Sequence, residues 1–518
     1  MGGIILTKAE EAGPAVAPPQ STPPPQTPSA RLAPGRVRLV FLGLVLALML
    51  AALEPMTVAT ALPGIADELH GQDRVSWVMT AYLLATAVAL PIHGKCGELY
   101  GRKGVLQFAL LVFVVGSALA GRSRTMDQLV VFRALQGVGA GGLLVGVQAI
   151  MADIVPARGR GRFTALAGAA FGLASVAGPL LGGYVTDHFS WRWCFYGNVP
   201  FGLMALALVT LAPKLPKPRR LPNSPRPAAK ARFDVVGALS LAIASTCLVL
   251  LASWGGTEYA WDSRVVLALG GGAVGATVLF LVVEHHAVEP LVPPRLFRDS
   301  VFNVTGIVGL VIGVALFTAG SWLPAFLQLT EGVSATESGL LMLPMTAGLV
   351  VASVVVGQLV SHTGHYRTYP VLGTALTAAG MWLLSHLDAD TPRLHHGIWT
   401  AVLGAGIGMV MPVLVVALQN SVRPADLQAA TSANSCLRLI GGSVGVAVCG
   451  ALLAAPAADG RALPVGLPAA LRDDHPGAYA ETLPRIFLYL VPVLVLGALL
   501  ACFLKGRPPV PQDAPTEP

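Results

Sequence analysis

A glutamate and an arginine stand inside long apolar stretches of this chain. Glu54 lies in the run Leu53–Pro63, and Arg133 begins the run Arg133–Gly137. A charged group near the bilayer centre costs about 2.5–3.5 kcal/mol on insertion scales, so such groups usually face a cavity and have a function. Because burial favours the neutral form of a carboxyl, Glu54 is suited to bind and release a proton. Arginine stays protonated, so Arg133 is suited to hold an anion or to act on a nearby acid.

Both residues also have a structural interpretation. Glu54 can be a carboxyl that is hydrogen-bonded to a neighbouring helix, and Arg133 can be an interfacial arginine whose side chain extends towards the membrane surface. Several amides lie in or near apolar stretches, where they either face a substrate or join two helices by hydrogen bonds. The candidates for a substrate pocket are Gln136, Gln148, Gln328 and Asn434.

A second group of charges follows the second apolar stretch. Glu98, Arg102 and Lys103 lie in a turn that also contains Gly94 and Gly101. Charges at such a turn can pair with each other and with a helix end. The pattern predicts a gate that stabilises one conformation, and a solvated loop is the alternative.

The apolar stretch Phe163–Val185 holds five glycines and a proline and no charged residue between its ends. In a water-exposed helix, each internal glycine costs about 1 kcal/mol and the proline about 3 kcal/mol. A membrane helix tolerates both, because neighbouring helices satisfy the freed backbone groups. Small residues also let another helix approach closely. We therefore expect a bent, tightly packed membrane helix with conformational roles for Gly178, Pro179, Gly182 and Gly183.

The composition indicates that membrane helices position these residues. The chain is 54% hydrophobic and 12% charged, whereas soluble domains carry roughly 25% charged residues. Apolar stretches long enough to cross a bilayer recur along its length. The sequence predicts an all-α integral membrane protein with about 14 transmembrane helices. The expected spans are 38–60, 75–94, 104–121, 128–151, 163–185, 195–213, 233–253, 264–284, 302–323, 337–361, 368–387, 397–418, 431–454 and 486–504.

The order of the spans predicts two six-helix bundles with two inserted helices. The motif at Gly94–Lys103 is repeated in weaker form at Gly357–Arg367, which indicates that the two halves of the chain are related. Such repeated halves are typical of rocking transporters. The expected parts are a disordered, proline-rich cytoplasmic tail (1–37), an N-terminal bundle (38–213), a basic cytoplasmic linker (214–232), the inserted helices (233–284), a second cytoplasmic linker (285–301), a C-terminal bundle (302–504) and a cytoplasmic tail (505–518).

Charge predicts the orientation. With both termini in the cytoplasm, every lysine falls on the inner side, which is the positive-inside bias. The predicted location is therefore the cell membrane, with many passes. The richness in alanine, glycine, proline and arginine suggests a high-GC bacterium.

Other classes of function find little support in the sequence. It has no phosphate-binding loop of the kind found in ATP-driven pumps, and its six cysteines form no CxxC pair. We assign the pairs His285–His286 and His395–His396 to loops and expect no metal site. The net charge of +7 is explained by the cytoplasmic loops, so no nucleic-acid partner is expected. We also expect no cofactor and no catalytic residues, because no nucleophile–base pair lies in the spans.

Five motifs together resemble those of the major facilitator superfamily, in particular its fourteen-span drug:proton antiporters. They are Leu53–Pro63, Gly94–Lys103, Arg133–Gly137, Ala174–Gly183 and Trp191–Pro200, and the resemblance covers about residues 38 to 504. It implies a role in proton transfer for Arg133 and an antiporter motif in the fifth span, associated with export. Glu54 and Glu98 stand where the family usually has aspartate, and Ala174 stands where the antiporter motif often has glycine.

These observations predict a secondary exporter in which protons enter while an amphipathic small molecule, such as an antibiotic, leaves. Its expected partners are the lipid bilayer, protons and that molecule, and the oligomeric state is left open. The alternative is a dedicated exporter of a self-made metabolite, siderophore or lipid, and a more remote one is a membrane receptor or scaffold on a transporter fold.

Overall fold

The computed structural model is almost entirely helical. It describes residues 34–71, 74–154, 174, 177–211, 233–255, 259–287, 289–363, 366–388, 391–423, 426–454 and 476–504. Within these residues there is no β-strand, only an isolated bridge between Gly255 and Tyr259. The predicted all-α class is confirmed. The predicted tail before residue 34, the linker 214–232, the tail 505–518 and the start of the fifth span lie outside the described residues.

Twelve of the described helices are long and apolar enough to cross a bilayer. A thirteenth, α13 (Thr368–Leu384), has 17 residues, and the helical residues 177–188 continue the predicted fifth span. The prediction of about 14 spans is consistent with this arrangement.

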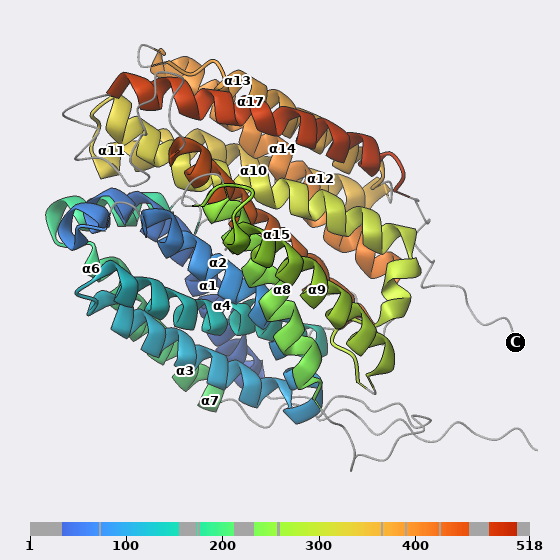
Figure 1. Cartoon of the computed structure of the whole chain (residues 1–518). Coiled ribbons are helices and arrows are strands. Elements are labelled where there is room, and N and C mark those ends of the chain that lie inside the picture. Colours follow the sequence, from blue (N-terminus) through green and yellow to red (C-terminus); the bar gives the residue numbers. More distant parts are fainter. Residues whose placement is uncertain are drawn as a thin grey trace, which may run out of the picture.

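The N-terminal helices form one bundle (Figure 1). In it α2 and α3 pack on α4, and α7 packs on α1. Gly101 separates α2 from α3 with a φ of 106°, a backbone conformation that L side chains rarely adopt. The helices are α1 (Pro34–Leu69), α2 (Val75–Tyr100), α3 (Arg102–Gly121), α4 (Met126–Ile154), α6 (Arg192–Tyr196) and α7 (Asn198–Leu211), together with residues 177–188.

The C-terminal helices form the second bundle, in which α12 and α13 pack on α14 and α10 packs on α15. The predicted span 337–361 is divided between α11 and α12 at Met342. Pro344 lies in the first turn of α12, and because proline has no N–H it cannot continue the preceding helix. The helices are α10 (Ser300–Thr330), α11 (Ala335–Leu341), α12 (Leu343–Thr363), α13, α14 (Arg393–Ser421), α15 (Leu427–Ala454) and α17 (Pro476–Ala501).

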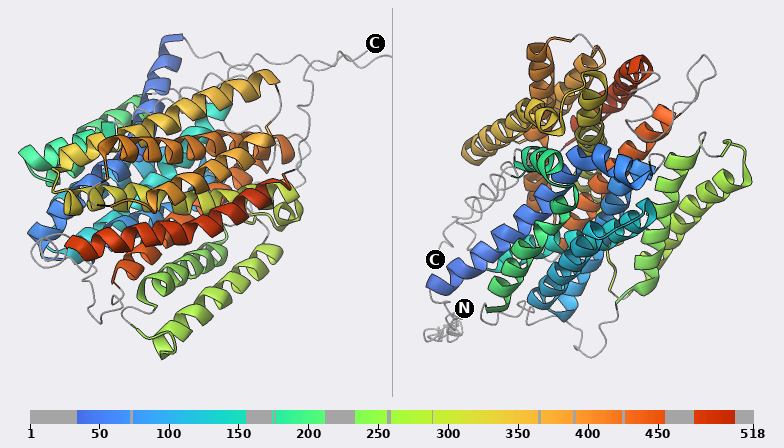
Figure 2. Two further views of the ribbon diagram at one scale, coloured as in Figure 1. Left: turned by 90° about the horizontal axis from the view of Figure 1, so that it is seen from above. Right: turned by 90° about the vertical axis from the view of Figure 1, so that its left-hand side faces the viewer.

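Two further helices, α8 (Val235–Trp254) and α9 (Arg264–His286), pack on each other at one side of the molecule (Figure 2). Their starts are capped by Asp234 and Ser263, whose side chains accept hydrogen bonds from Gly237 N and Val266 N. Helix α8 packs on both α2 and α15. The inserted pair therefore contacts one helix of each bundle. The short 3₁₀ helix η4 (Pro294–Arg298) lies in the linker to α10.

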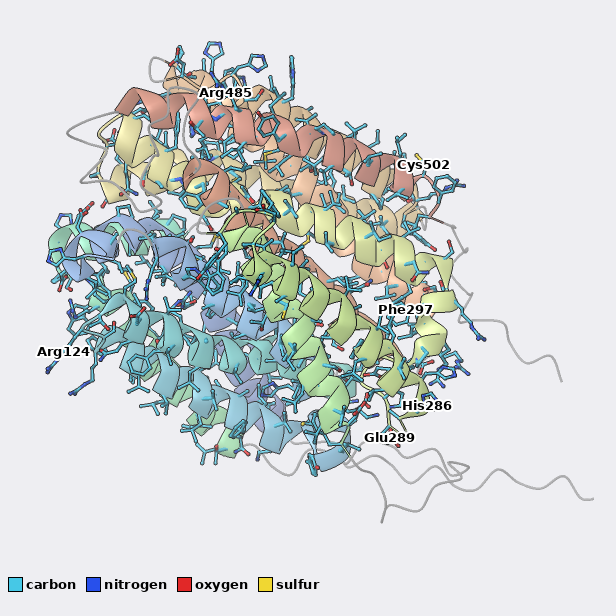
Figure 3. All side chains as sticks on the ribbon, in the orientation of Figure 1. Arg124, His286, Glu289, Phe297, Arg485 and Cys502 are labelled. Atoms are coloured by element: carbon cyan, nitrogen blue, oxygen red, sulfur yellow. The ribbon has the colours of Figure 1, made fainter. Side chains whose placement is uncertain are left out.

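The bundles meet mainly where α2 packs on α15 and where α1 packs on α10 and α11. Figure 3 shows Arg124 and Arg485 towards one end of the molecule and His286, Glu289 and Cys502 towards the other. We call these the predicted outer end and the predicted cytoplasmic end. The assignment of the histidine pairs to loops was wrong, since His285 and His286 end α9, and His395 and His396 lie in α14. Each pair continues the helical hydrogen bonding of its apolar stretch.

Candidate functional site

Glu54 of α1 and Arg133 of α4 form an ion pair inside the N-terminal bundle. Both side chains are 0% exposed, and Arg133 Nη1 donates to Glu54 Oε1. Arg133 Nη1 also donates to Gln136 Oε1 at 2.8 Å, and its Nε donates to the carbonyl of Val78 at 3.1 Å. The guanidinium lies over the ring of Tyr82, 4.2 Å from its centroid. Arg133 is thus a buried cation with several acceptors and does not extend to the membrane surface.

A chain of hydrogen bonds continues from Arg133 to the outer part of the bundle. Gln136 Nε2 donates to Ser117 Oγ at 3.1 Å, and Ser117 Oγ donates to the carbonyl of Phe195 at 2.9 Å. Asn198 Nδ2 lies 3.3 Å from Ser117 Oγ. The network joins α1, α3, α4, α6 and α7, so a change at the ion pair would be felt by most helices of this bundle.

Two polar atoms beside the ion pair lack a hydrogen-bond partner. Both Glu54 Oε2 and the Tyr82 hydroxyl are buried and unpaired, although the two side chains are close enough to interact. A buried polar group without a partner costs roughly 1–3 kcal/mol. Arg133 therefore holds the carboxyl through one oxygen, and the other oxygen, on the side of Tyr82, is able to take a proton.

The glycines of the fifth span lie against α1 at the level of Glu54. A Cβ on Gly178 would lie 2.7 Å from Met56 Cβ, and a Cβ on Gly182 would lie 2.3 Å from the carbonyl oxygen of Thr57. Real Cβ atoms essentially never approach so closely, so only glycine permits this contact. Gly183 and Pro179 are also buried.

The same helix contacts the C-terminal bundle. A Cβ on Gly339 of α11 would lie 2.7 Å from the carbonyl oxygen of Pro179. Nearer the predicted outer end, the backbone N–H of Thr336 donates to Asp187 Oδ2 at 3.0 Å. The residues beside Glu54 are therefore linked, through one helix, to the facing bundle.

The predicted gate residues are placed at helix ends. Arg102 Nη1 donates to the carbonyl of Ala149 in α4 at 2.9 Å, and Lys103 Nζ donates to the carbonyl of Thr210 in α7 at 3.1 Å. Glu98 pairs with Lys95, with 3.6 Å between Oε2 and Nζ. Gly94 lies opposite Ser432 of α15. The turn thus fastens the start of α3 to α4 and α7.

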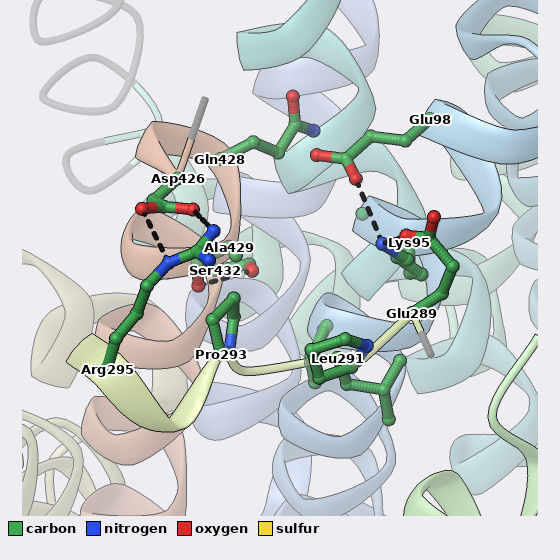
Figure 4. Close-up of a pocket in the computed structure, with 13 residues that line it drawn as sticks. Lys95, Glu98, Glu289, Leu291, Pro293, Arg295, Asp426, Gln428, Ala429 and Ser432 are labelled. Atoms are coloured by element: carbon green, nitrogen blue, oxygen red, sulfur yellow. Dashed lines mark hydrogen bonds and ion pairs between the residues drawn. The ribbon is translucent and has the colours of Figure 1, made fainter. Parts of the chain in front are cut away.

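Sequence reasoning missed a set of ion pairs that surrounds a cavity of about 240 Å³ at the predicted cytoplasmic end (Figure 4). Lys95 Nζ lies 2.7 Å from Glu289 Oε2. Arg295 pairs with Asp426, and its Nε lies 3.0 Å from Asp426 Oδ2. The hydrogen bond to Asp426 raises the pKa of Arg295, so the pair stabilises the charged form of this side chain. The sequence signal that could have predicted these pairs was the presence of opposite charges, Glu289 and Arg295, in the linker 285–301.

The linker that carries Glu289 and Arg295 is itself held by α9. Glu284 is buried, and its carboxylate accepts hydrogen bonds from the backbone N–H groups of Leu291 at 3.1 Å and Val292 at 3.2 Å. The linker therefore ties α2 to α15 by two ion pairs. We call these two pairs, Lys95–Glu289 and Arg295–Asp426, the linker clasp.

The four amides proposed for a substrate pocket are placed differently from one another. Gln136 belongs to the buried network, and Gln328 donates to Ser338 Oγ at 3.0 Å, which joins α10 to α11. Gln148 is exposed on α4. Asn434 lines a cavity in the C-terminal bundle. No group of His, Cys, Asp or Glu able to hold a metal ion occurs among the described residues.

Two facing helical bundles with a buried ion pair are the architecture of a multi-pass membrane transporter. The family model described as Major Facilitator Superfamily matches residues 44–446, so this chain belongs to that superfamily. The predicted resemblance is confirmed. By its family, the chain is a membrane transporter rather than an enzyme.

Named relatives extend this finding. The chain is 40% identical to an uncharacterized MFS-type transporter of Mycobacterium tuberculosis, over 96% of this chain and 73% of the relative. It is 36% identical to the multidrug transporter protein MdtP of Bacillus subtilis, over 80% and 75% of the two chains. A solved structure described as an auto-inhibited POT family peptide transporter aligns with a TM-score of 0.60 at 14% identity, covering 92% of this chain and 99% of that one. That likeness shows the fold alone.

Proposed function

We propose that this chain is a proton-driven exporter of amphipathic small molecules, such as antibiotics. The observation that carries the proposal is the fully buried Glu54–Arg133 pair, in which Glu54 Oε2 has no hydrogen-bond partner. Two relatives are named multidrug transporter and multidrug resistance protein, which supports export of small molecules. The Gly-Pro motif of the fifth span supports the same direction.

The chemistry follows from the charge balance of the pair. Ionised Glu54 is held by the cationic Arg133, so the pair is neutral as a whole. Protonation of Glu54 at its free oxygen removes the attraction and leaves a buried cation, a state that favours a rearrangement of α1 against α4. Release of the proton on the other side of the membrane restores the pair. Each proton that enters is worth about 2.3 kcal/mol per 100 mV of membrane potential.

The fifth span carries this rearrangement to the second bundle. The turn of α1 that holds Glu54 rests on Gly178 and Gly182, and Pro179 between them lies against Gly339 of α11. A tight backbone contact has few intermediate arrangements, so a shift of α1 changes the contact between the bundles. We propose that loss of the proton and release of the cargo are linked by this path.

The test starts with an accumulation and resistance panel in a pump-deficient host, with and without a protonophore, which identifies an exported compound. Glu54→Gln should then abolish gradient-driven export of that compound while the protein still reaches the membrane, because the amide cannot carry a proton. The matched control is Glu68→Gln on the same helix, where Glu68 is half exposed and pairs with Arg192.

Full export by the Glu54→Gln variant would contradict the assignment of the proton carrier. Export by the unmodified chain that persists when the protonophore has collapsed the gradient would contradict proton coupling as such.

A further inference from the structure

Arg438 of α15 is a second arginine at membrane depth, and its surroundings differ from those of Arg133. It lies eleven residues after Leu427, where α15 begins, which places it about 16 Å along the helix at 1.5 Å per residue. The predicted span 431–454 begins seven residues before Arg438, so Arg438 lies about 10 Å inside a hydrocarbon core that is about 30 Å thick. A cation at this depth calls for an explanation.

Arg438 has no carboxylate partner among the described residues. Its one described side-chain hydrogen bond is a weak one from Nη1 to the thioether of Met411, at 3.7 Å. Arg133 at a similar depth has a carboxylate, an amide oxygen and a backbone carbonyl as acceptors. A guanidinium has five N–H donors, and most of those on Arg438 have no acceptor among the described residues.

Arg438 lines a small cavity between α10, α14 and α15. Asn434 lies one turn before it on the same face of α15 and also lines the cavity. The Asn434 amide donates to Thr305 Oγ1 at 2.7 Å, whereas its Oδ1 is buried with no partner. The cavity thus presents a cation with free donors beside a free acceptor.

We infer that Arg438 and Asn434 form a binding site for the anionic group of the cargo, a carboxylate with a neighbouring hydroxyl or N–H. A guanidinium matches the two oxygens of a carboxylate in shape and charge. Asn434 Oδ1 would accept the neighbouring donor. The inference rests on the proposed function and adds the chemical class of the cargo, an amphipathic acid.

The size of the cavity limits what it can receive. Its volume is about 20 Å³, and roughly 10–15 Å³ is needed to hold one water. In this conformation it therefore has room for about one water, and the charged head enters only when the surrounding helices move apart. Leu414, Val415 and Leu418 of α14 also line it and offer apolar surface to the apolar body of the cargo.

The experiment measures binding to the purified full chain in lipid nanodiscs without any gradient, so it does not depend on proton coupling. The probes are 1-pyrenebutyrate and its uncharged methyl ester, followed by tryptophan quenching, with empty nanodiscs subtracted. Arg438→Gln should weaken binding of the acid at least tenfold, equivalent to about 1.4 kcal/mol, and that of the ester less than twofold. Arg438→Lys should lose less, because it keeps the charge. The control is Arg264→Gln, at an exposed arginine of α9.

Unchanged binding of the acid by Arg438→Gln would overturn the inference, as would an equal loss for both probes, which indicates a packing role. If the unmodified chain binds the ester but not the acid, the inference fails and the proposed function stands. If it binds neither probe, the inference fails as well, while the proposed function is decided separately by the export assay with the protonophore. A competition measurement needs no variant: dodecanoate should displace pyrenebutyrate at a lower concentration than dodecanol, and equal displacement would again overturn the inference.

Discussion

At the scale of single residues, the buried Arg133 and the half-buried Arg438 have different surroundings. Arg133 is neutralised by Glu54, so the N-terminal bundle keeps a pair that is open to one proton. Arg438 has no described carboxylate partner, so the C-terminal bundle keeps a positive charge. Removing one member of a buried ion pair typically costs about 3–5 kcal/mol, because the other charge is left uncompensated. We therefore propose that the two sites respond to different ligands, a proton and an anion.

The guanidinium of Arg133 has several N–H donors, which predicts that a lysine with the same charge cannot replace it. Its Nε and Nη1 donate in different directions, to Val78 and to Glu54 and Gln136. A lysine has one compact ammonium and cannot reach all of these acceptors. Arg133→Lys should therefore lower gradient-driven transport on the order of tenfold or more, measured in inside-out vesicles. Arg264→Lys is the control, and near-normal transport by Arg133→Lys would show that charge suffices.

At the scale of elements, the contact between the fifth span and α1 is set by backbone distance. Gly182 faces the carbonyl of Thr57 so closely that a methyl group has no room. Backbone atoms cannot turn aside as a flexible side chain can, so the two helices must separate or the span must rotate.

Substitution of these glycines tests the element directly. Gly178→Leu and Gly182→Ala should each uncouple transport from the proton gradient or block it, measured as proton leak and as export in the same vesicles. Gly271→Ala in α9 is the control, because a Cβ there meets no atom within 4 Å. Normal coupled export by Gly178→Leu would show that this helix has a packing role only.

At the scale of the whole molecule, the inserted pair α8–α9 holds the linker that contacts both bundles. Glu284 of α9 fixes the linker, and the linker clasp joins α2 of one bundle to α15 of the other. Because the bundles must move relative to each other in a rocking transporter, a clasp at the predicted cytoplasmic end favours one of the states.

Charge exchange tests the clasp. Lys95→Glu and Glu289→Lys should each change the transport rate several-fold, since each places like charges opposite each other, and the double variant should restore at least half of the normal rate. All four chains carry Glu98→Gln, because Lys95 also pairs with Glu98, so the comparison isolates the Lys95–Glu289 pair. Failure of the double variant to recover would mean that the Lys95–Glu289 contact does not control the rate.

Hydropathy and charge along the chain were enough to predict the class of fold and the approximate spans, and to single out Glu54 and Arg133 as candidates. These are local properties, because a span is recognised from the hydropathy of consecutive residues and a charge is conspicuous within an apolar run. The division of one span at Pro344, by contrast, was missed, since a proline near the start of a helix and one within a helix look alike without the neighbouring packing.

Tertiary structure alone decided which of these residues meet. Glu54 and Arg133 are 79 positions apart, and Lys95 and Glu289 are 194 apart. The backbone of Thr57 gives no sequence signal that Gly182 will rest on it. Hydropathy places a residue along the membrane normal but leaves the rotation of each helix and the choice of its neighbour undetermined. Those depend on how small residues and polar groups fit between helices, which is a property of the assembled bundle.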